Sequence, residues 1–180
     1  MDYPDMMVDL ETTGTQPEHT NIIQIAAVRF NLKEGTIDPQ FFDQCLYLSP
    51  NRFWDESTRS WWATMPDVYD SICARMIPAK VVLQNLINWN DGHQPMFWAK
   101  PVSFDYTFLD SYFREHELTN PWHFRKRMDQ NTFIRARHFP EPPPNYERDI
   151  EFQGTAHNAI DDVLHQIGVV MTCYEATKHG

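Results

Sequence analysis

The stretch MVDLETTG, residues 7–14, decides the fold of this chain. A short apolar run carries two acids one residue apart and ends in Thr-Thr-Gly. Side chains alternate across a β-strand, so Asp9 and Glu11 should point to one face of a sheet while Val8 and Leu10 point to the other. Two carboxylates on one face of a buried strand repel each other and lose hydration. A divalent cation such as Mg²⁺ or Mn²⁺ offsets both effects, because it prefers oxygen ligands. The alternative is a strand end at which both acids simply reach water.

The composition is that of a globular protein. Apolar residues make up 42% of the 180 residues, which is too many for a disordered chain, and the length predicts a single domain over residues 1–180. No apolar run approaches the roughly 18 residues that span a membrane, and no basic segment precedes an apolar one as in a signal peptide. The cysteines are few, odd in number and widely spaced, which favours a reducing compartment, here the cytoplasm: Cys45, Cys73 and Cys173.

The net charge argues against binding of nucleic acid by a broad basic surface. The formal charge is −10, whereas proteins that hold long duplexes by a basic surface are positive. A nucleic-acid enzyme is still compatible with this charge, because metal ions in a site neutralise phosphates locally.

The apolar patterns predict a mixed α/β fold. Residues 6–10, 21–30 and 41–48 are expected to be strands, and their short connections indicate an antiparallel meander, since a parallel crossover needs a dozen or more residues. Residues 95–99 form a fourth expected strand, 124–137 are ambiguous and read as part strand, part helix, and 140–146 contain four prolines and should be a loop. Helices are expected from about residue 57 and over 67–76, 79–90, 104–116 and 156–177. We therefore predict a sheet with helices on its faces.

Two later motifs join the opening acids. The first is WAKPVSFD, residues 98–105, in which an apolar strand leads to Asp105 at a helix start; a helix-capping acid is the alternative there. The second is HNAIDD, residues 157–162. If His157 precedes the helix, it can lean over a site that Asp162 reaches from the second turn, while Asp161 projects about 100° away toward solvent or a capping role.

This set of motifs resembles the DEDDh branch of the DnaQ-like 3′–5′ exonucleases, which have the ribonuclease-H-like fold. Asp-x-Glu-Thr-Thr-Gly is similar to the first motif of that group, Ser-Phe-Asp-x-x-Phe-Leu to the second and His-x-Ala-x-x-Asp to the third. Within the group the chain resembles the Rv2179c-like and phage exoribonuclease family, with added likeness in Trp61-Trp62 and in residues 128–133. One departure is that Val102 and Ser103 stand where many relatives have Asn or His, which puts one side-chain contact to substrate in doubt.

The resemblance implies roles for the motif residues. Asp9, Glu11 and Asp162 would hold one Mg²⁺ or Mn²⁺ ion, and Asp9 would bridge to a second ion that Asp105 helps to hold through water. Two such ions clamp the scissile phosphate and activate water. His157 would be the general base, a task suited to an imidazole at neutral pH. The residues expected to meet the substrate are Leu10, Thr12, Thr13, Gly14 and Phe104. For these five, core packing or an ordinary turn is the alternative.

The implied function is a metal-dependent 3′–5′ exonuclease. It would remove nucleoside 5′-monophosphates from the 3′ end of single-stranded nucleic acid, with RNA favoured and DNA, as in a phage-type or proofreading-like enzyme, as the alternative. A binding module that kept the fold and an endonuclease of the ribonuclease-H group are the competing classes, and a homodimer is a further expected partner state. The basic cluster over residues 125–138 predicts either a phosphate track or a solvated face, and Trp54, Trp61 and Trp62 are expected to pack in the core or at a dimer contact rather than stack on bases.

Overall fold

Strand β1 (Asp5–Thr12), which carries the two opening acids, lies inside the sheet of the computed structural model, which describes residues 2–178. It pairs antiparallel with β2 (Ile22–Asn31) along its length. It also pairs parallel with β6 (Met96–Ala99), but that ladder ends where Met7 lies opposite Trp98. Beyond Met7, the β6-facing edge of β1 is therefore free to meet the residues that follow β6.

The sheet is mixed, as the sequence predicts. Its order is β5-β4-β2-β1-β6-β7, and β3 pairs with β2 at one end. The antiparallel part consists of β1, β2, β3 (Thr36–Ile37) and β4 (Phe42–Leu46), which confirms the meander. The strands β5 (Met76–Ile77), β6 and β7 (Arg127–Asp129) pair in parallel with their neighbours.

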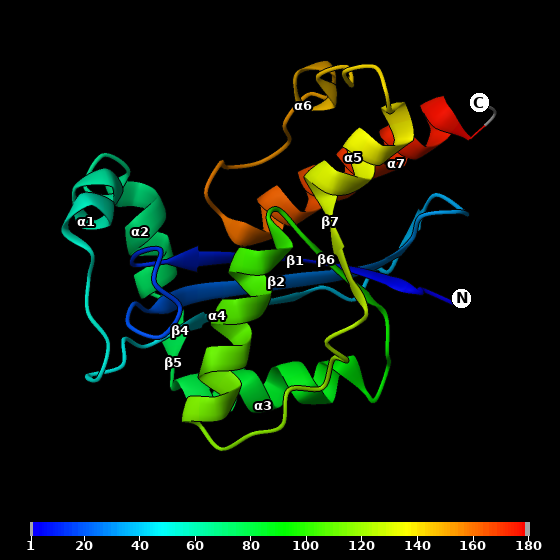
Figure 1. The fold of residues 1–180 in the computed structure, drawn as a ribbon. Helices are drawn as coiled ribbons and strands as arrows, with labels where there is room; N and C mark the ends of the chain where they lie inside the picture. Colours follow the sequence, from blue (N-terminus) through cyan, green and yellow to red (C-terminus); the bar gives the residue numbers. More distant parts are fainter. Residues whose placement is uncertain (1, 179–180) are drawn as a thin grey trace.

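Helices cover both faces of the sheet (Figure 1). On one face, α3 (Ala79–Asn90) and α4 (Val102–Glu115) pack against Val8 and Leu10. On the other, α7 (Ala159–Thr177), with α5 (Gln130–His138) beside it, packs against Met7. The strand period thus places Met7, Asp9 and Glu11 on the α7 face, so the predicted alternation is confirmed. The remaining helices are α1 (Glu56–Trp62), α2 (Pro66–Cys73) and α6 (Tyr146–Asp149). Within residues 2–178, no helix has the length and hydropathy needed to cross a bilayer.

Several predicted boundaries differ from the structure. The helix expected over 67–76 ends at Cys73, because Met76 and Ile77 form β5 and pair with Cys45 and Leu46. The stretch 124–137, expected to be part strand and part helix, does divide into β7 and α5, and the carboxylate of Asp129 caps the helix by accepting a 2.8 Å hydrogen bond from the Thr132 amide. The proline loop ends in the short helix α6, which begins at Tyr146, the last residue of the predicted loop.

The segment between β4 and α1 is fixed by one buried arginine. The guanidinium of Arg52 lies over the ring of Tyr112 at 4.1 Å. It donates four hydrogen bonds, to the carbonyls of Pro17 and Thr20, the hydroxyl of Ser111 and the carboxylate of Glu115. Arg52 therefore ties the turn after β1 to helix α4, and both of these elements lead to the acids described below.

Replacing Arg52 with alanine should lower the free energy of unfolding by about 3 kcal/mol, because it leaves the carbonyls of Pro17 and Thr20 without this donor and removes the cationic partner of Glu115. Lysine at position 52 should not restore the free energy of unfolding, since an ammonium cannot present the planar fork of donors of a guanidinium. Urea unfolding of both variants measures this, with the exposed Arg125→Ala as the control. A loss below about 1 kcal/mol for Arg52→Ala would show that this cluster is not a stabilising element.

Candidate active site

The two acids of β1 differ in their surroundings. Asp9 is partly exposed, and its Oδ1 accepts a 2.8 Å hydrogen bond from Nε2 of Gln166 on α7. Glu11 is 8% exposed, and no cation forms a salt bridge with it in the described part of the chain. A buried carboxylate without a cationic partner lowers the stability of the folded protein. A bound cation would offset this electrostatic penalty.

Asp105 reaches the same place from the other side of the sheet. It lies in the first turn of α4 and is 3% exposed. The backbone amide of Leu10 hydrogen-bonds to its carboxyl group, which is possible because the ladder to β6 has already ended there. The alternative role as a helix cap belongs to other residues: Pro101 is at the cap position, and Asp129 accepts the 3.0 Å hydrogen bond from the amide of Val102.

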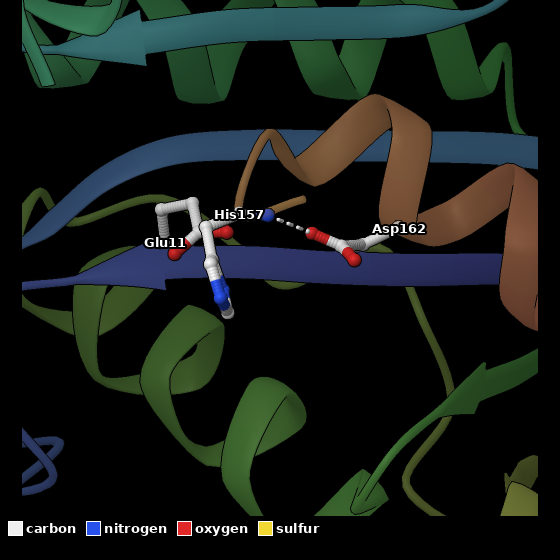
Figure 2. A group of neighbouring side chains, drawn as sticks. All are labelled: Glu11, His157 and Asp162. Atoms are coloured by element: carbon white, nitrogen blue, oxygen red, sulfur yellow. Dashed lines mark hydrogen bonds between the residues drawn. The ribbon is translucent and has the colours of Figure 1, made fainter. Parts of the chain in front are cut away.

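His157 and Asp162 complete the group from the start of α7 (Figure 2). One ligand atom from each of Glu11, His157 and Asp162 lies within 4.8 Å of the others. The backbone amide of His157 donates a 2.9 Å hydrogen bond to Oδ2 of Asp162, drawn as the dashed line in Figure 2. The final helix begins at Ala159 rather than at the predicted residue 156, so His157 precedes it and Asp162 lies in its first turn rather than its second.

Asp161 turns away from this group into a capping role. Its Oδ2 accepts hydrogen bonds from the amide of Thr155 at 2.9 Å and from the side chain of Asn158 at 3.1 Å. The two neighbouring acids therefore have different roles. Asp161 fixes the loop before the helix, and Asp162 faces Glu11 and His157.

The electrostatics show that the four carboxyl groups act on one another. Burial, then the charge of Asp162, raises the pKa of Asp9 to about 7, against a weaker opposing effect of the Gln166 hydrogen bond and Lys100. Burial raises the pKa of Glu11 well above its usual range, and the charges of Asp9, Asp162 and Asp105 add to it. The pKa of Asp105 is raised by burial and by Asp9, and that of Asp162 is raised mainly by burial. Four acids with raised pKa values in one place form a site of strong negative potential.

These side chains fit a divalent ion. They offer carboxylate oxygens, the donor type that Mg²⁺ and Mn²⁺ prefer, and an imidazole close by. In addition, Oε1 of Gln166 is buried without a hydrogen-bond partner among the described residues, although the same amide contacts Asp9. A metal-bound water would provide the missing donor. Lys100 acts on Asp9 from outside the group, but its ammonium is engaged in an ion pair with Glu147.

The raised pKa of Asp9 makes metal-free stability depend on pH. The folded pKa of about 7 lies above the unfolded value, so the stabilising contribution is fully present below about pH 4 and is lost as the pH rises toward 7. With EDTA, we therefore expect Tm to fall by about 5 °C between pH 5.5 and 7.5 relative to the Asp9→Asn variant. Mg²⁺ should remove most of this difference, because it replaces the protons. Equal pH profiles for the two proteins would contradict the assignment of a perturbed Asp9.

The Thr-Thr-Gly turn is held tightly by the protein itself. The hydroxyl of Thr13 is used twice, donating to the carbonyl of Phe53 at 3.0 Å and accepting from the amide of Asn21 at 2.7 Å. Thr12 donates to the carbonyl of Gly14 at 2.7 Å. A Cβ on Gly14 would come within 2.6 Å of the side chain of Thr20, so only glycine fits there. The turn thus has a structural role, and contact with a substrate stays a prediction for these residues.

The other two residues expected at the substrate have apolar neighbours. Leu10 is 6% exposed and belongs to the core beneath α3 and α4. Phe104 is half-buried and packs against Phe108, with ring centroids 4.7 Å apart. The structure therefore gives both a packing role, and a contact with a base is not tested by it.

Two buried glutamines that the motifs did not single out support the site. Gln166 lies four residues after Asp162, so both point from the same face of α7, and this helical spacing is the signal in the sequence. Gln24 lies opposite Glu11 on β2. It donates to Asp43 and to the side chain of Asn158, both at 2.8 Å, and accepts from the amide of Ala159 at 3.2 Å. Gln24 therefore fixes the start of α7, and with it the segment that carries His157.

Three cations of the basic cluster pack against aromatic rings, the first being Arg125, which lies over the ring of Phe124 at 5.2 Å. Arg127 lies over the ring of Tyr106 at 4.1 Å, and Arg137 lies over the ring of Tyr174 at 5.0 Å. Contacts of this kind use the guanidinium for packing within the fold. Arg135 is exposed on α5.

Comparisons with known proteins agree with this geometry. Residues 4–174 match the model of the Rv2179c-like 3′–5′ exoribonuclease domain. A comparison with the curated proteins finds no match. Among solved structures, the chain is similar to the nuclease domain of 3′hExo, a DEDDh family member bound to rAMP, with 18% identity, TM-score 0.68 and coverage of 97% of this chain and 94% of that one.

Two further structures share the fold over only part of their length. The zinc-bound complex of E. coli ExoI with single-stranded DNA has 16% identity and TM-score 0.74, covering 97% of this chain and 41% of that one. The cell-death related nuclease CRN-4 has 18% identity and TM-score 0.69, covering 96% of this chain and 65% of that one. The chain thus spans less than two thirds of either protein, and these likenesses show the ribonuclease-H-like fold. The family-model match, which covers nearly the whole sequence, shows that the chain belongs to the Rv2179c-like family of 3′–5′ exoribonuclease domains.

Proposed function

We propose that this protein is a metal-dependent 3′–5′ exonuclease that releases nucleoside 5′-monophosphates from single-stranded nucleic acid, with RNA as its preferred substrate. The observation that carries the proposal is the convergence of Glu11, His157 and Asp162 within 4.8 Å. Asp9 and Asp105 are electrostatically coupled to the same group. A binding module would have no need for four such carboxylates beside an imidazole, because their mutual repulsion destabilises the metal-free protein.

Asp9, Glu11 and Asp162 would hold the first Mg²⁺ or Mn²⁺ ion, and Asp9 and Asp105 would hold the second. Bound there, the two ions neutralise the phosphate and lower the pKa of a water nucleophile. The protein contributes the fixed carboxylates: Gln166 orients Asp9, the Leu10 amide orients Asp105, and the His157 amide orients Asp162. In E. coli ExoI the bound ion is zinc, so the identity of the ion is itself part of the proposal.

His157 would accept the proton of the attacking water. Its imidazole lies beside two of the carboxylates, and neither ring nitrogen has a hydrogen-bond partner within residues 2–178. A free ring nitrogen at the site is the requirement for a general base. When the P–O bond to the 3′-oxygen breaks, that oxygen would take up a proton from a solvent water, and the imidazole would return the proton it accepted to solvent, because the His157 side chain is partly exposed.

The choice of RNA rests on the family, whose description is an exoribonuclease. Solved structures of the same fold include one bound to rAMP and one bound to single-stranded DNA, each a property of that protein. Recognition of RNA requires a contact to the 2′-hydroxyl. DNA is therefore the alternative substrate that the test must include.

Digestion of matched oligonucleotides tests the proposal. RNA and DNA of one sequence are labelled at the 5′ end and incubated with Mg²⁺ or Mn²⁺, and in a separate sample with EDTA. We expect a ladder that shortens from the 3′ end, faster for RNA, and no product with EDTA. A faster ladder on DNA would establish the deoxyribonuclease alternative. Internal fragments would indicate an endonuclease, and no cleavage of either strand would leave a binding module.

The cellular setting and assembly are also proposals. All three cysteines are free, and Cys45 and Cys173 are buried, which supports a reducing compartment such as the cytoplasm. A homodimer stays a prediction, and light scattering coupled to size-exclusion chromatography measures it.

A further inference from the structure

An exposed tryptophan touches the proposed general base. The rings of Trp61 and His157 meet edge to face, with centroids 4.7 Å apart and an interplanar angle of 81°. Trp61 comes from α1, whereas His157 comes from the segment before α7, much later in the chain. The contact therefore forms only in the folded protein, at the centre of the site.

His157 lacks the hydrogen bond that usually orients a catalytic base. Such a base is normally fixed by a third group that bonds its second ring nitrogen. Here the carboxylate of Asp162 accepts the backbone amide of His157, and within residues 2–178 no side chain bonds the imidazole. The backbone fixes where the residue lies, with φ at 65°, but it does not fix the torsions of the side chain. The ring contact with Trp61 is what remains to orient the imidazole.

Contacts through Trp62 fix the position of Trp61 relative to strand β1. Its ring packs edge to face against Trp62, with centroids 5.0 Å apart. Trp62 is 2% exposed, and its Nε1 donates a 3.0 Å hydrogen bond to the carbonyl of Thr12 at the end of β1. One short path thus connects the strand of Asp9 and Glu11 to the His157 ring.

Core packing does not account for the position of Trp61. Its side chain is 40% exposed, whereas the neighbouring Trp62 fills the core with Ile23, Cys45 and Ile72. The prediction of core packing or a dimer contact is confirmed as core packing for Trp62, whereas Trp61 is not a core residue and its dimer contact stays a prediction. A large aromatic ring left exposed beside a catalytic group indicates a role in function rather than in stabilising the fold.

We propose that Trp61 is a positioning residue that holds the His157 imidazole in the orientation needed to accept a proton from the attacking water. The inference rests on the proposed function, because it takes His157 as the general base. It goes beyond the three motifs, since Trp61 lies in none of them and contributes no ligand atom. Trp61 contacts neither the metal nor the reacting water and acts only through His157.

A double-mutant cycle tests this. We expect Trp61→Ala to lower kcat for a single-stranded oligonucleotide about 30-fold, because a small misplacement of a catalytic group has effects of this order. KM should stay within about twofold, and Trp61→Phe, which keeps an aromatic edge or face, should recover most of kcat. In a His157→Asn background, Trp61→Ala should change kcat less than about twofold, since the group it orients is absent. Asparagine is chosen because it tolerates positive φ, where alanine is strained.

Matched controls distinguish this positioning role from a substrate contact and from a purely structural role. Phe124→Ala removes another exposed aromatic ring and should change neither constant. Tm of Trp61→Ala should stay within about 2 °C of the wild type, as expected for an exposed side chain. An equal loss of kcat in both backgrounds, a rise in KM that persists in the His157→Asn background, or no loss at all would each overturn the inference. A fully active His157→Asn single variant would instead overturn the proposed role of His157, and the inference with it.

Discussion

Replacing Asp9 with asparagine should lower kcat for oligonucleotide hydrolysis on the order of 10³-fold. Asp9 is the carboxylate to which both ions are assigned, and it interacts with Asp162, Glu11 and Asp105. Asparagine keeps the shape and an oxygen that can accept the hydrogen bond from Gln166, so the change removes charge and little else. A rate assay at saturating Mg²⁺ measures the loss.

The same substitution should stabilise the metal-free protein while it removes activity. Burial raises the pKa of Asp9 because the ionised form is costly there, and a neutral amide avoids that cost. We therefore expect Asp9→Asn to have a higher Tm than the wild type in EDTA at pH 7.5 and a smaller rise in Tm with Mg²⁺. The exposed pair of Asp110 with Arg114 offers a control: Asp110→Asn should change neither activity nor the metal response. A near-wild-type rate for Asp9→Asn would remove the metal assignment.

The second large effect is expected at His157. Substitution by asparagine should lower kcat about 10² to 10⁴-fold, the range for loss of a general base, with little change in KM. The fold should persist, because asparagine accepts the backbone conformation at φ 65° and keeps the amide that bonds Asp162. Rates measured against pH should also lose the limb that reports the base, leaving a flatter profile on the acidic side.

A matched histidine separates this effect from general loss of imidazole. His123 is exposed and stacks on Phe124, away from the four acids, so His123→Asn should leave the rate unchanged. If His157→Asn kept both the rate and the acidic limb of its pH profile, the base would have to be another group, and His157 would be only a neighbour of the metal.

The sequence predicts the core of the site because its signals are local. The period of a strand is enough to place Asp9 and Glu11 on one face, and their order before Thr-Thr-Gly marks the strand end. The existence of α7 can be read from the apolar spacing that follows His157, although the helix begins three residues later than predicted, and the antiparallel meander can be read from the short connections between three apolar runs. Each of these depends on residues that are close together in the chain.

What the sequence did not show depends on pairing across long distances. Two-residue strands such as β5 exist only because Met76 meets Cys45, and no local period marks them. The role of Gln24 appears only when β2, β4 and the start of α7 meet. The contact between Trp61 and His157 is equally invisible, because helical spacing treats Trp61 and Trp62 alike although the fold buries one and leaves the other beside the site.

The central claim is that Asp9, Glu11, Asp105 and Asp162 gather divalent ions beside His157. Crystals soaked in MnCl₂ and measured at the manganese absorption edge test it most directly, because anomalous scattering identifies the ion and its place. We expect anomalous peaks between the carboxylates of Asp9, Glu11 and Asp162, and their loss in crystals of Asp9→Asn. Anomalous density elsewhere on the molecule, with none among these carboxylates at saturating manganese, would contradict it.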